Sequence, residues 1–213
     1  MNIQEKLVLI RDLIWSEYLL IPLLAFVGIY LTIGLLGIPW RKIPLAITTL
    51  WHGREEVTEQ KGDISPFQAL MTELSATVGT GNIVGVATAI YFGGPGAIFW
   101  MWIIALFGMA TKYAEAVLAV TYREEDENGN YVGGPMYYIL NGLGKNWRWM
   151  AGLFAFFAMF AAFGIGNMVQ SNSVADEMHS TFRIPFWVTG IVMSICVSLV
   201  IIGGVKRIAK VAS

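Results

Sequence analysis

The segment best suited to chemistry lies within an apolar stretch and combines glycines with side chains that form hydrogen bonds. Residues 74–85 read Leu-Ser-Ala-Thr-Val-Gly-Thr-Gly-Asn-Ile-Val-Gly. Gly79 and Gly81 each weaken a helix by about 1 kcal/mol relative to alanine. The side chains that can bond to backbone groups freed by a break are Thr77, Thr80 and Asn82. Irregular backbone survives in hydrocarbon only where protein or a watery cavity covers it, so the segment predicts a broken helix with a binding site.

Such a break serves two opposite electrostatic functions at one point. The first half-helix ends in carbonyls suited to sodium or an ammonium group, while the second begins with free N–H groups suited to a carboxylate. A zwitterionic amino acid fits both ends. Alternatively, the glycines only allow close packing of a neighbouring helix. A dinucleotide fingerprint is excluded, because the spacing Gly79, Gly81, Gly85 is one residue too long and no soluble strand precedes it.

Other polar groups lie near the ends of later apolar stretches. Asn167 and Gln170, at i and i+3, are expected on one helix face, where they complete the solute site or only tie helices together. Lys112 is expected to pair with Glu115 and to reach the membrane surface. Glu73 precedes the predicted break by about one and a half turns, so it either lines an inner pathway or meets interfacial water.

The elements that position these residues must be membrane helices. The chain is 56% hydrophobic and only 14% charged, unlike a soluble domain. Its net charge of −1 provides no basic field for nucleic acid, so no nucleic-acid partner is expected. A single cysteine, Cys196, excludes an intrachain disulfide and a cysteine-clustered metal site, and no nucleophile–base pair or HExxH pattern indicates an enzyme. No organic cofactor is expected.

A membrane helix needs about 20 mostly apolar residues, and the chain offers five such stretches. The expected spans are 18–40, 66–92, 97–122, 147–169 and 185–203. Between them, 123–130 is expected to form an exposed turn and 133–140 to begin a short interfacial helix, while 171–184 is a connection. The first stretch lacks a small-residue cleavage pattern and is therefore expected to be a retained span.

Basic residues in the connections predict the orientation. They follow the first, third and fifth spans, whereas the connections after the second and fourth hold almost none. Because short basic loops stay in the cytoplasm, the N-terminus is expected outside and the C-terminus inside. The basic residues after those three spans are Arg41, Lys42, Arg54, Lys61, Arg123, Lys145, Arg148, Lys206, Arg207 and Lys210.

Three motifs resemble one family over essentially the whole chain. They are Thr-Val-Gly-Thr-Gly-Asn-Ile-Val-Gly at 77–85, Gly-Gly-Pro-Gly-Ala-Ile-Phe-Trp-Met-Trp at 93–102 continuing to Gly108, and Gly-Gly-Val-Lys-Arg-Ile at 203–208. Together they are similar to the sodium:alanine symporter family, also called the alanine or glycine:cation symporters. The resemblance implies an all-α integral membrane fold of two inverted five-helix repeats, with the first helix of each broken at the midplane and one extra helix before them.

The resemblance also implies roles for individual residues. The amides of Thr80, Gly81 and Asn82 would meet a substrate carboxylate, the carbonyls of Thr77 and Val78 would hold its amino group or sodium, and Gln170 would reach the substrate. Carbonyls of Ser75 and Val78 are candidate sodium ligands. The expected site is therefore Thr77, Val78, Gly79, Thr80, Gly81, Asn82, Asn167 and Gln170, with Ser75 and Val78 for sodium.

The resemblance divides the chain into 1–65, an extra helix with a cytoplasmic connection, and 66–213, the first four helices of the first repeat. The second repeat is missing, so the chain alone is expected to perform no coupled transport. The complete protein is expected to import a small neutral amino acid, such as alanine or glycine, with sodium across the plasma membrane by alternating access. The alternative is a membrane scaffold or assembly subunit whose glycines only pack helices.

Overall fold

The computed structural model describes residues 2–16, 18–52 and 64–213, and these residues are almost entirely helical. Two of the basic residues used for orientation, Arg54 and Lys61, lie outside them. The first elements are α1 (Ile3–Ile14), α2 (Leu20–Gly34), α3 (Ile38–Arg41), α4 (Ile43–His52), α5 (Pro66–Thr77), the π-helical η1 (Gly81–Gly85), α6 (Val86–Gly93) and α7 (Gly96–Thr121). The remainder are β1 (Glu124–Glu125), β2 (Tyr131–Val132), α8 (Pro135–Leu143), the 3₁₀ turn η2 (Lys145–Trp147), α9 (Arg148–Ala161), the π-helical η3 (Ala162–Met168), α10 (Val169–Phe182), α11 (Phe186–Ile201) and α12 (Gly204–Ala212).

The prediction of an all-α membrane protein is confirmed. Within the described part of the chain, Gly96–Thr121 and Lys145–Phe182 are long and apolar enough to cross a bilayer. Two bent pairs also qualify if each is one span: Pro66–Thr77 with Gly81–Gly93, bent by 58°, and Phe186–Ile201 with Gly204–Ala212, bent by 114°. The remaining expected span appears as the shorter apolar helix α2, Leu20–Gly34.

The prediction of one continuous span over 18–40 is wrong at its C-terminal end. Helix α2 ends at Gly34, and the chain turns before α3 begins at Ile38. Leu36 and Gly37 have φ values of 50° and 66°, which an α-helix does not tolerate, and Pro39 then favours a new helix start. Counting apolar residues could not detect this turn, because the residues in it are themselves apolar.

The fourth span also has different bounds. Helices α9, η3 and α10 continue without interruption from Arg148 to Phe182, so the connection expected over 171–184 is largely helix. The sequence 169–182 is polar but contains no glycine or proline to end a helix. The helix stops where Arg183 adopts a left-handed φ of 58°, two residues before Pro185.

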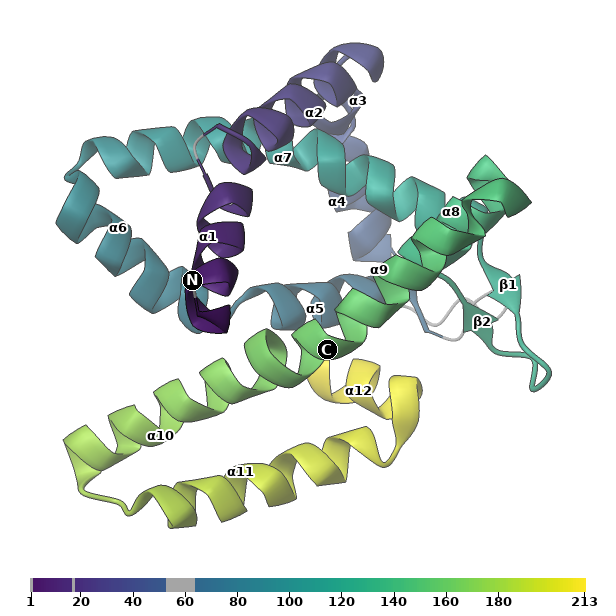
Figure 1. Ribbon diagram of the computed structural model, residues 1–213. Helices are drawn as coiled ribbons and strands as arrows, with labels where there is room; N and C mark the ends of the chain where they lie inside the picture. Colours follow the sequence, from purple (N-terminus) through teal and green to yellow (C-terminus); the bar gives the residue numbers. More distant parts are fainter. Residues whose placement is uncertain (1, 17, 53–63) are drawn as a thin grey trace.

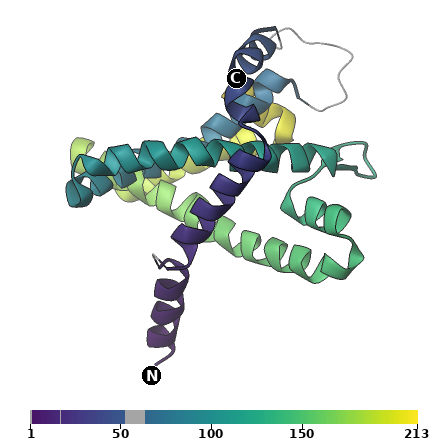
Figure 2. The same ribbon diagram turned by 90° about the horizontal axis from the view of Figure 1, so that it is seen from above.

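The helices form an open arrangement in which α5 lies near the centre and α6 at one edge (Figure 1). Helix α7 lies along one edge with α2 against it, and α11 runs back alongside α10 (Figure 1). Helix α12 folds back to contact α5. From above, α1 extends away from the other helices (Figure 2). The buried residues in the described part are all small, as is typical where membrane helices approach closely: Gly28, Ala110, Ala151, Thr189 and Ala209.

Replacing Gly28 with leucine is expected to separate α2 from α7. A Cβ at Gly28 would lie 3.0 Å from Phe107 Cβ and 3.4 Å from the Phe107 carbonyl oxygen, so a larger side chain has no room. Overpacking of this kind costs about 1–3 kcal/mol, measurable as a lower thermal midpoint of the detergent-solubilised chain. Gly34→Leu is the matched control, because a Cβ there meets nothing within 4 Å. Equal midpoints for the two variants would contradict the packing.

The exposed turn expected over 123–130 is confirmed as the tip of a small antiparallel hairpin, β1 with β2. The Asp126 carboxylate closes the tip by accepting hydrogen bonds from the backbone N–H of Asn130 at 2.8 Å and of Asn128 at 2.9 Å. The expected short helix appears as α8, which is tied to the hairpin because Asn141 Nδ2 donates to Glu124 Oε1 at 2.8 Å.

The hairpin tip is expected to loosen in acid. Hydrogen bonds from Asn130, first from its backbone and then from its side chain, hold the pKa of Asp126 below its usual value. At pH values above the ordinary carboxyl pKa, the ionised Asp126 stabilises the tip fully. This stabilisation is lost as the pH falls through the lowered pKa of the folded state. A ¹³C-carboxyl titration should place the Asp126 midpoint below that of an unstructured aspartate. Asp126→Asn should remove the pH dependence of the Asn130 amide resonance. An Asp126 titration midpoint equal to that of an unstructured aspartate would contradict the hydrogen bonds at the tip.

Candidate functional site

The predicted break in the helix over 66–92 is present. Helix α5 starts with a capping box, in which Ser65 and Gln68 each accept from the other's backbone N–H, and with Pro66 at its first turn. It ends at Thr77, and Val78 is extended, with φ −80° and ψ 109°. The chain then resumes as η1 and α6, bent by 58° from α5. An unbroken helix over this segment would have excluded a site here.

Side chains, rather than the helical ladder, bind the backbone at the break. The Gly79 N–H donates to Asn82 Oδ1 at 3.1 Å, and the Thr80 N–H donates to Gln170 Oε1 at 3.1 Å. In a continuous α-helix these two amides would donate to the carbonyls of Ser75 and Ala76. Those carbonyls therefore lose their usual donors and lie at the end of α5, where the helix dipole favours a cation.

Gln170 binds the backbone at the break although it lies 90 residues from Thr80. It belongs to α10, directly after the π-helical stretch η3. A Cβ added at Gly79 would lie 2.7 Å from Gln170 Nε2, so the amide approaches within reach only because residue 79 is glycine. Gly79 is thus needed both to break the helix and to admit this side chain.

The other predicted residues are distributed unevenly around the break. The Thr77 hydroxyl donates back to the Glu73 carbonyl at 2.8 Å, and the Asn82 N–H donates to the Gly79 carbonyl at 3.0 Å. Asn167 does not share Gln170's partner, because its Nδ2 donates to the Ala162 carbonyl of its own helix at 3.1 Å. The wide turn of η3 accounts for that bond, which sequence spacing alone did not indicate. The remaining members of the predicted set are Ser75 on α5, the extended Val78, and Gly81 at the start of η1.

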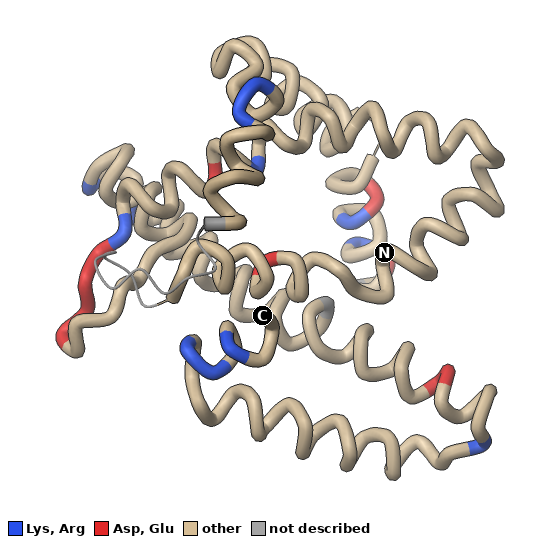
Figure 3. The backbone as a smooth tube through the Cα atoms, turned by 180° about the vertical axis from the view of Figure 1, so that it is seen from behind, with Lys and Arg blue, Asp and Glu red and all other residues tan. Residues whose placement is uncertain are grey.

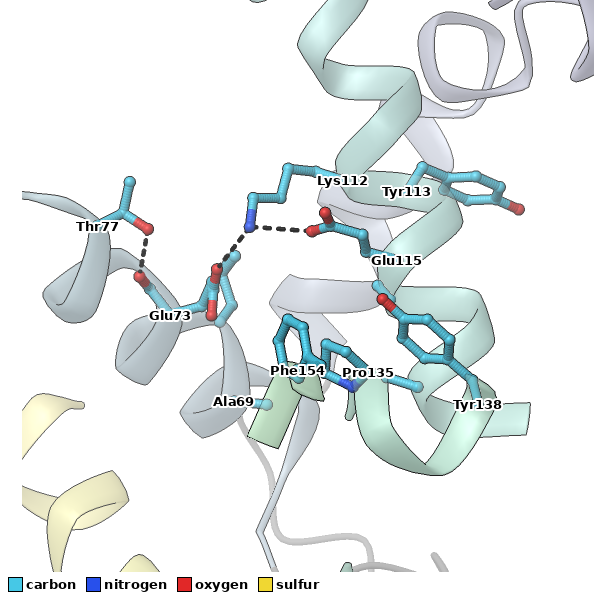
Figure 4. Close-up of a pocket in the computed structure, with 12 residues that line it drawn as sticks. Ala69, Glu73, Thr77, Lys112, Tyr113, Glu115, Pro135, Tyr138 and Phe154 are labelled. Atoms are coloured by element: carbon cyan, nitrogen blue, oxygen red, sulfur yellow. Dashed lines mark hydrogen bonds and ion pairs between the residues drawn. The ribbon is translucent and has the colours of Figure 1, made fainter. Parts of the chain in front are cut away.

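A cavity of about 880 Å³ adjoins the break on the α5 side. Lys112 lies between two carboxylates, 3.1 Å from Glu115 as the i,i+3 spacing predicted, and 3.9 Å from Glu73 across the gap to α5 (Figure 4). Glu73 therefore lines this cavity. The sequence did not indicate that Tyr138 of α8 would also line it. The full lining is Ala69, Leu70, Glu73, Thr77, Lys112, Tyr113, Glu115, Ala116, Ala119, Pro135, Tyr138 and Phe154.

The polar groups at the break are mainly backbone atoms. Among the described residues there is no group of three or more His, Cys, Asp or Glu side chains that could hold a metal ion. At the break there are carbonyl oxygens, which can coordinate sodium, and backbone N–H groups, which can donate hydrogen bonds to a carboxylate. The break is therefore suited to reversible binding of a small zwitterion and a monovalent cation.

Comparison with known proteins shows which family the chain resembles. A family model described as the sodium:alanine symporter family matches residues 1–213. An uncharacterized transporter of Haemophilus influenzae is 54% identical over 100% of this chain and 46% of its own length. The sodium/alanine symporter AgcS of Methanococcus maripaludis is 52% identical over 94% of this chain and 44% of its own length. The probable sodium/glutamine symporter GlnT of Bacillus subtilis is 44% identical over 95% of this chain and 41% of its own length. The chain thus spans less than half the length of these relatives.

Proposed function

Because the chain belongs to the sodium:alanine symporter family, we propose that it forms part of a transporter that imports a small neutral amino acid, such as alanine or glycine, with sodium. The observation that supports this most directly is the break at Val78–Thr80, where backbone amides are bound by the side chains of Asn82 and Gln170. A scaffold that used its glycines only for packing would need neither the bend nor these bonds.

The coupling ion and the carboxylate of the solute would bind at opposite ends of the break. Sodium would be held by carbonyls at the end of α5, with Ser75 and Val78 as proposed ligands, since the usual donor to the Ser75 carbonyl bonds to Asn82 instead. The amino group of the solute would lie near the carbonyls of Thr77 and Val78. A positive ion at this point offsets the negative end of the α5 dipole and attracts the solute carboxylate.

The carboxylate would bind the amides of Thr80, Gly81 and Asn82. Gln170 Oε1 already occupies the Thr80 N–H, in the position that one carboxylate oxygen would take. A charged acceptor forms a bond roughly twice as strong as a neutral amide does, so the solute can displace this bond and leave Gln170 free to contact it. Binding would thus exchange one internal hydrogen bond for a stronger one.

Transport would proceed by alternating access in the plasma membrane, with the N-terminus outside and the C-terminus inside. One sodium ion entering down about 100 mV and a tenfold gradient supplies about 3.7 kcal/mol, enough to concentrate a solute several hundredfold. The residues present here would form one wall of the site. The C-terminal part found in the longer relatives would complete it, as the shared length of less than half suggests.

The test uses the full-length protein in proteoliposomes. Alanine uptake should require sodium, with potassium or choline as the replacing cation, and calorimetry should show alanine binding that weakens without sodium. Gly81→Leu, which places a bulky side chain at the start of η1, should remove both signals. Alanine binding that changes neither on removal of sodium nor in Gly81→Leu would instead support the membrane scaffold.

A further inference from the structure

The last helix of the chain differs from all the spans. Helix α12 has nine residues, Gly204–Ala212, and turns by 114° from α11 at the glycine pair Gly203–Gly204. It carries three cationic side chains, Lys206, Arg207 and Lys210. Each would cost about 2.5–3.5 kcal/mol at the centre of a membrane helix, so α12 is not the second half of a span. A helix at this angle to a membrane-crossing α11 lies along the membrane surface.

The two faces of α12 have opposite character. Ala209 is fully buried, Ile208 and Ala212 are half-buried, and this apolar side contacts α5. Lys206, Arg207 and Lys210 are exposed. In the part of the chain that the structure describes, no carboxylate lies within 4.0 Å of these three side chains, since the ion pairs found there involve other residues. The helix therefore presents a row of cations without an internal counter-charge.

A hollow beside α12 adds polar groups to this row. It has a volume of about 440 Å³ and lies between the hairpin and the α11–α12 corner, lined by Asn130, Tyr131 and residues 203–206. The hairpin itself is acidic, with Glu124, Glu125, Asp126 and Glu127, so the exposed cations beside the hollow are those of α12. Figure 3 shows the basic segment of α12 on the side of the molecule that carries the hairpin.

We propose that the exposed face of α12 forms a docking surface for anionic phospholipid headgroups. A headgroup phosphate supplies the counter-charge that the cationic row lacks, and the hollow is large enough to hold a headgroup. Charge complementarity favours the inner leaflet, whose anionic lipids attract basic segments next to a span. Because the buried face of α12 contacts α5, a bound lipid would also restrain the first half of the broken helix. This proposal does not depend on which solute is carried.

The test measures lipid selectivity by electron spin resonance. The purified chain is reconstituted in phosphatidylcholine containing trace spin-labelled phosphatidylglycerol or spin-labelled phosphatidylcholine. We expect the anionic label to be preferred roughly tenfold at low salt, since one cation near such a surface contributes up to about fivefold and screening reduces the combined effect. The triple variant Lys206→Gln, Arg207→Gln, Lys210→Gln should lose most of this preference. Single Lys206→Gln and Lys210→Gln variants should each lose part of it.

Matched controls separate this surface from general charge. Lys6→Gln, Arg11→Gln, Arg183→Gln removes the same number of cations from other elements and should keep the preference, as should the charge-preserving Lys206→Arg, Arg207→Lys, Lys210→Arg. Circular dichroism checks that each variant stays helical. Equal affinity of the original chain for both labels, or full preference in the triple and single variants, would overturn the proposal. So would loss of the preference on adding inorganic phosphate at constant ionic strength, which would assign a free-phosphate site.

Discussion

Replacing Gly79 with alanine in the full-length protein is expected to lower sodium-dependent alanine uptake at least about tenfold. The added methyl group would lie 2.7 Å from Gln170 Nε2, closer than side-chain atoms approach. Because the neighbouring atom is the end of a flexible side chain, Gln170 moves away and its bond to the Thr80 N–H is lost. The displaced Gln170 also no longer reaches the solute carboxylate. A hydrogen bond to a charged group contributes about 1.5–3 kcal/mol, and about 1.4 kcal/mol corresponds to tenfold. Initial uptake rates in proteoliposomes measure the effect.

Two further variants show whether Gly79→Ala acts through Gln170. Gly85→Ala is the control, because a Cβ there meets nothing within 4 Å and uptake should stay near normal. Gly79→Ala combined with Gln170→Ala should transport no worse than Gln170→Ala alone, since both changes remove one contact and their effects are not additive. Full activity of Gly79→Ala, or additive losses in the double variant, would show that the close approach has no part in transport.

Replacing Asn82 with leucine is expected to weaken alanine binding by about tenfold, whereas the same change at Asn167 should alter it less than about threefold. Asn82 Oδ1 accepts from the Gly79 N–H, so its loss leaves a break amide without its partner. Asn167 bonds only to the Ala162 carbonyl of its own helix among the described residues. Calorimetry with alanine in saturating sodium compares the two. Equal losses would contradict this ranking and would favour the prediction that Asn167 contacts the solute.

The sequence predicted the local features of the site well. The break between Thr77 and Gly81 follows from glycines and hydroxyl side chains in an apolar setting, because each weakens helical bonding at that point. The pair Lys112–Glu115 follows from its i,i+3 spacing. These features depend on neighbours in the chain, so the residue order is enough to predict them.

Features that depend on distant parts of the chain could not be predicted in the same way. That Gln170 would bond to Thr80, and that Lys112 would also approach Glu73, depends on how separate helices pack. Hydropathy also failed to mark helix ends, since it ended the fourth span at Val169 where the chain merely becomes polar. The turn at Gly37 was missed for the opposite reason, because it is apolar. Hydropathy reports the surroundings of a residue rather than its backbone conformation.

The two π-helical stretches, η1 and η3, lie directly beside the bond between Thr80 and Gln170. Each wide turn contains one residue more than an α-helical turn. If the extra residue moved along the helix, each residue that it passed would rotate about the helix axis by about 100° and shift along it by about 1.5 Å. The backbone hydrogen bonds on either side would stay formed. The helices that contain η1 and η3 would then present different side chains to a bound solute, while both ends of each helix stay in place.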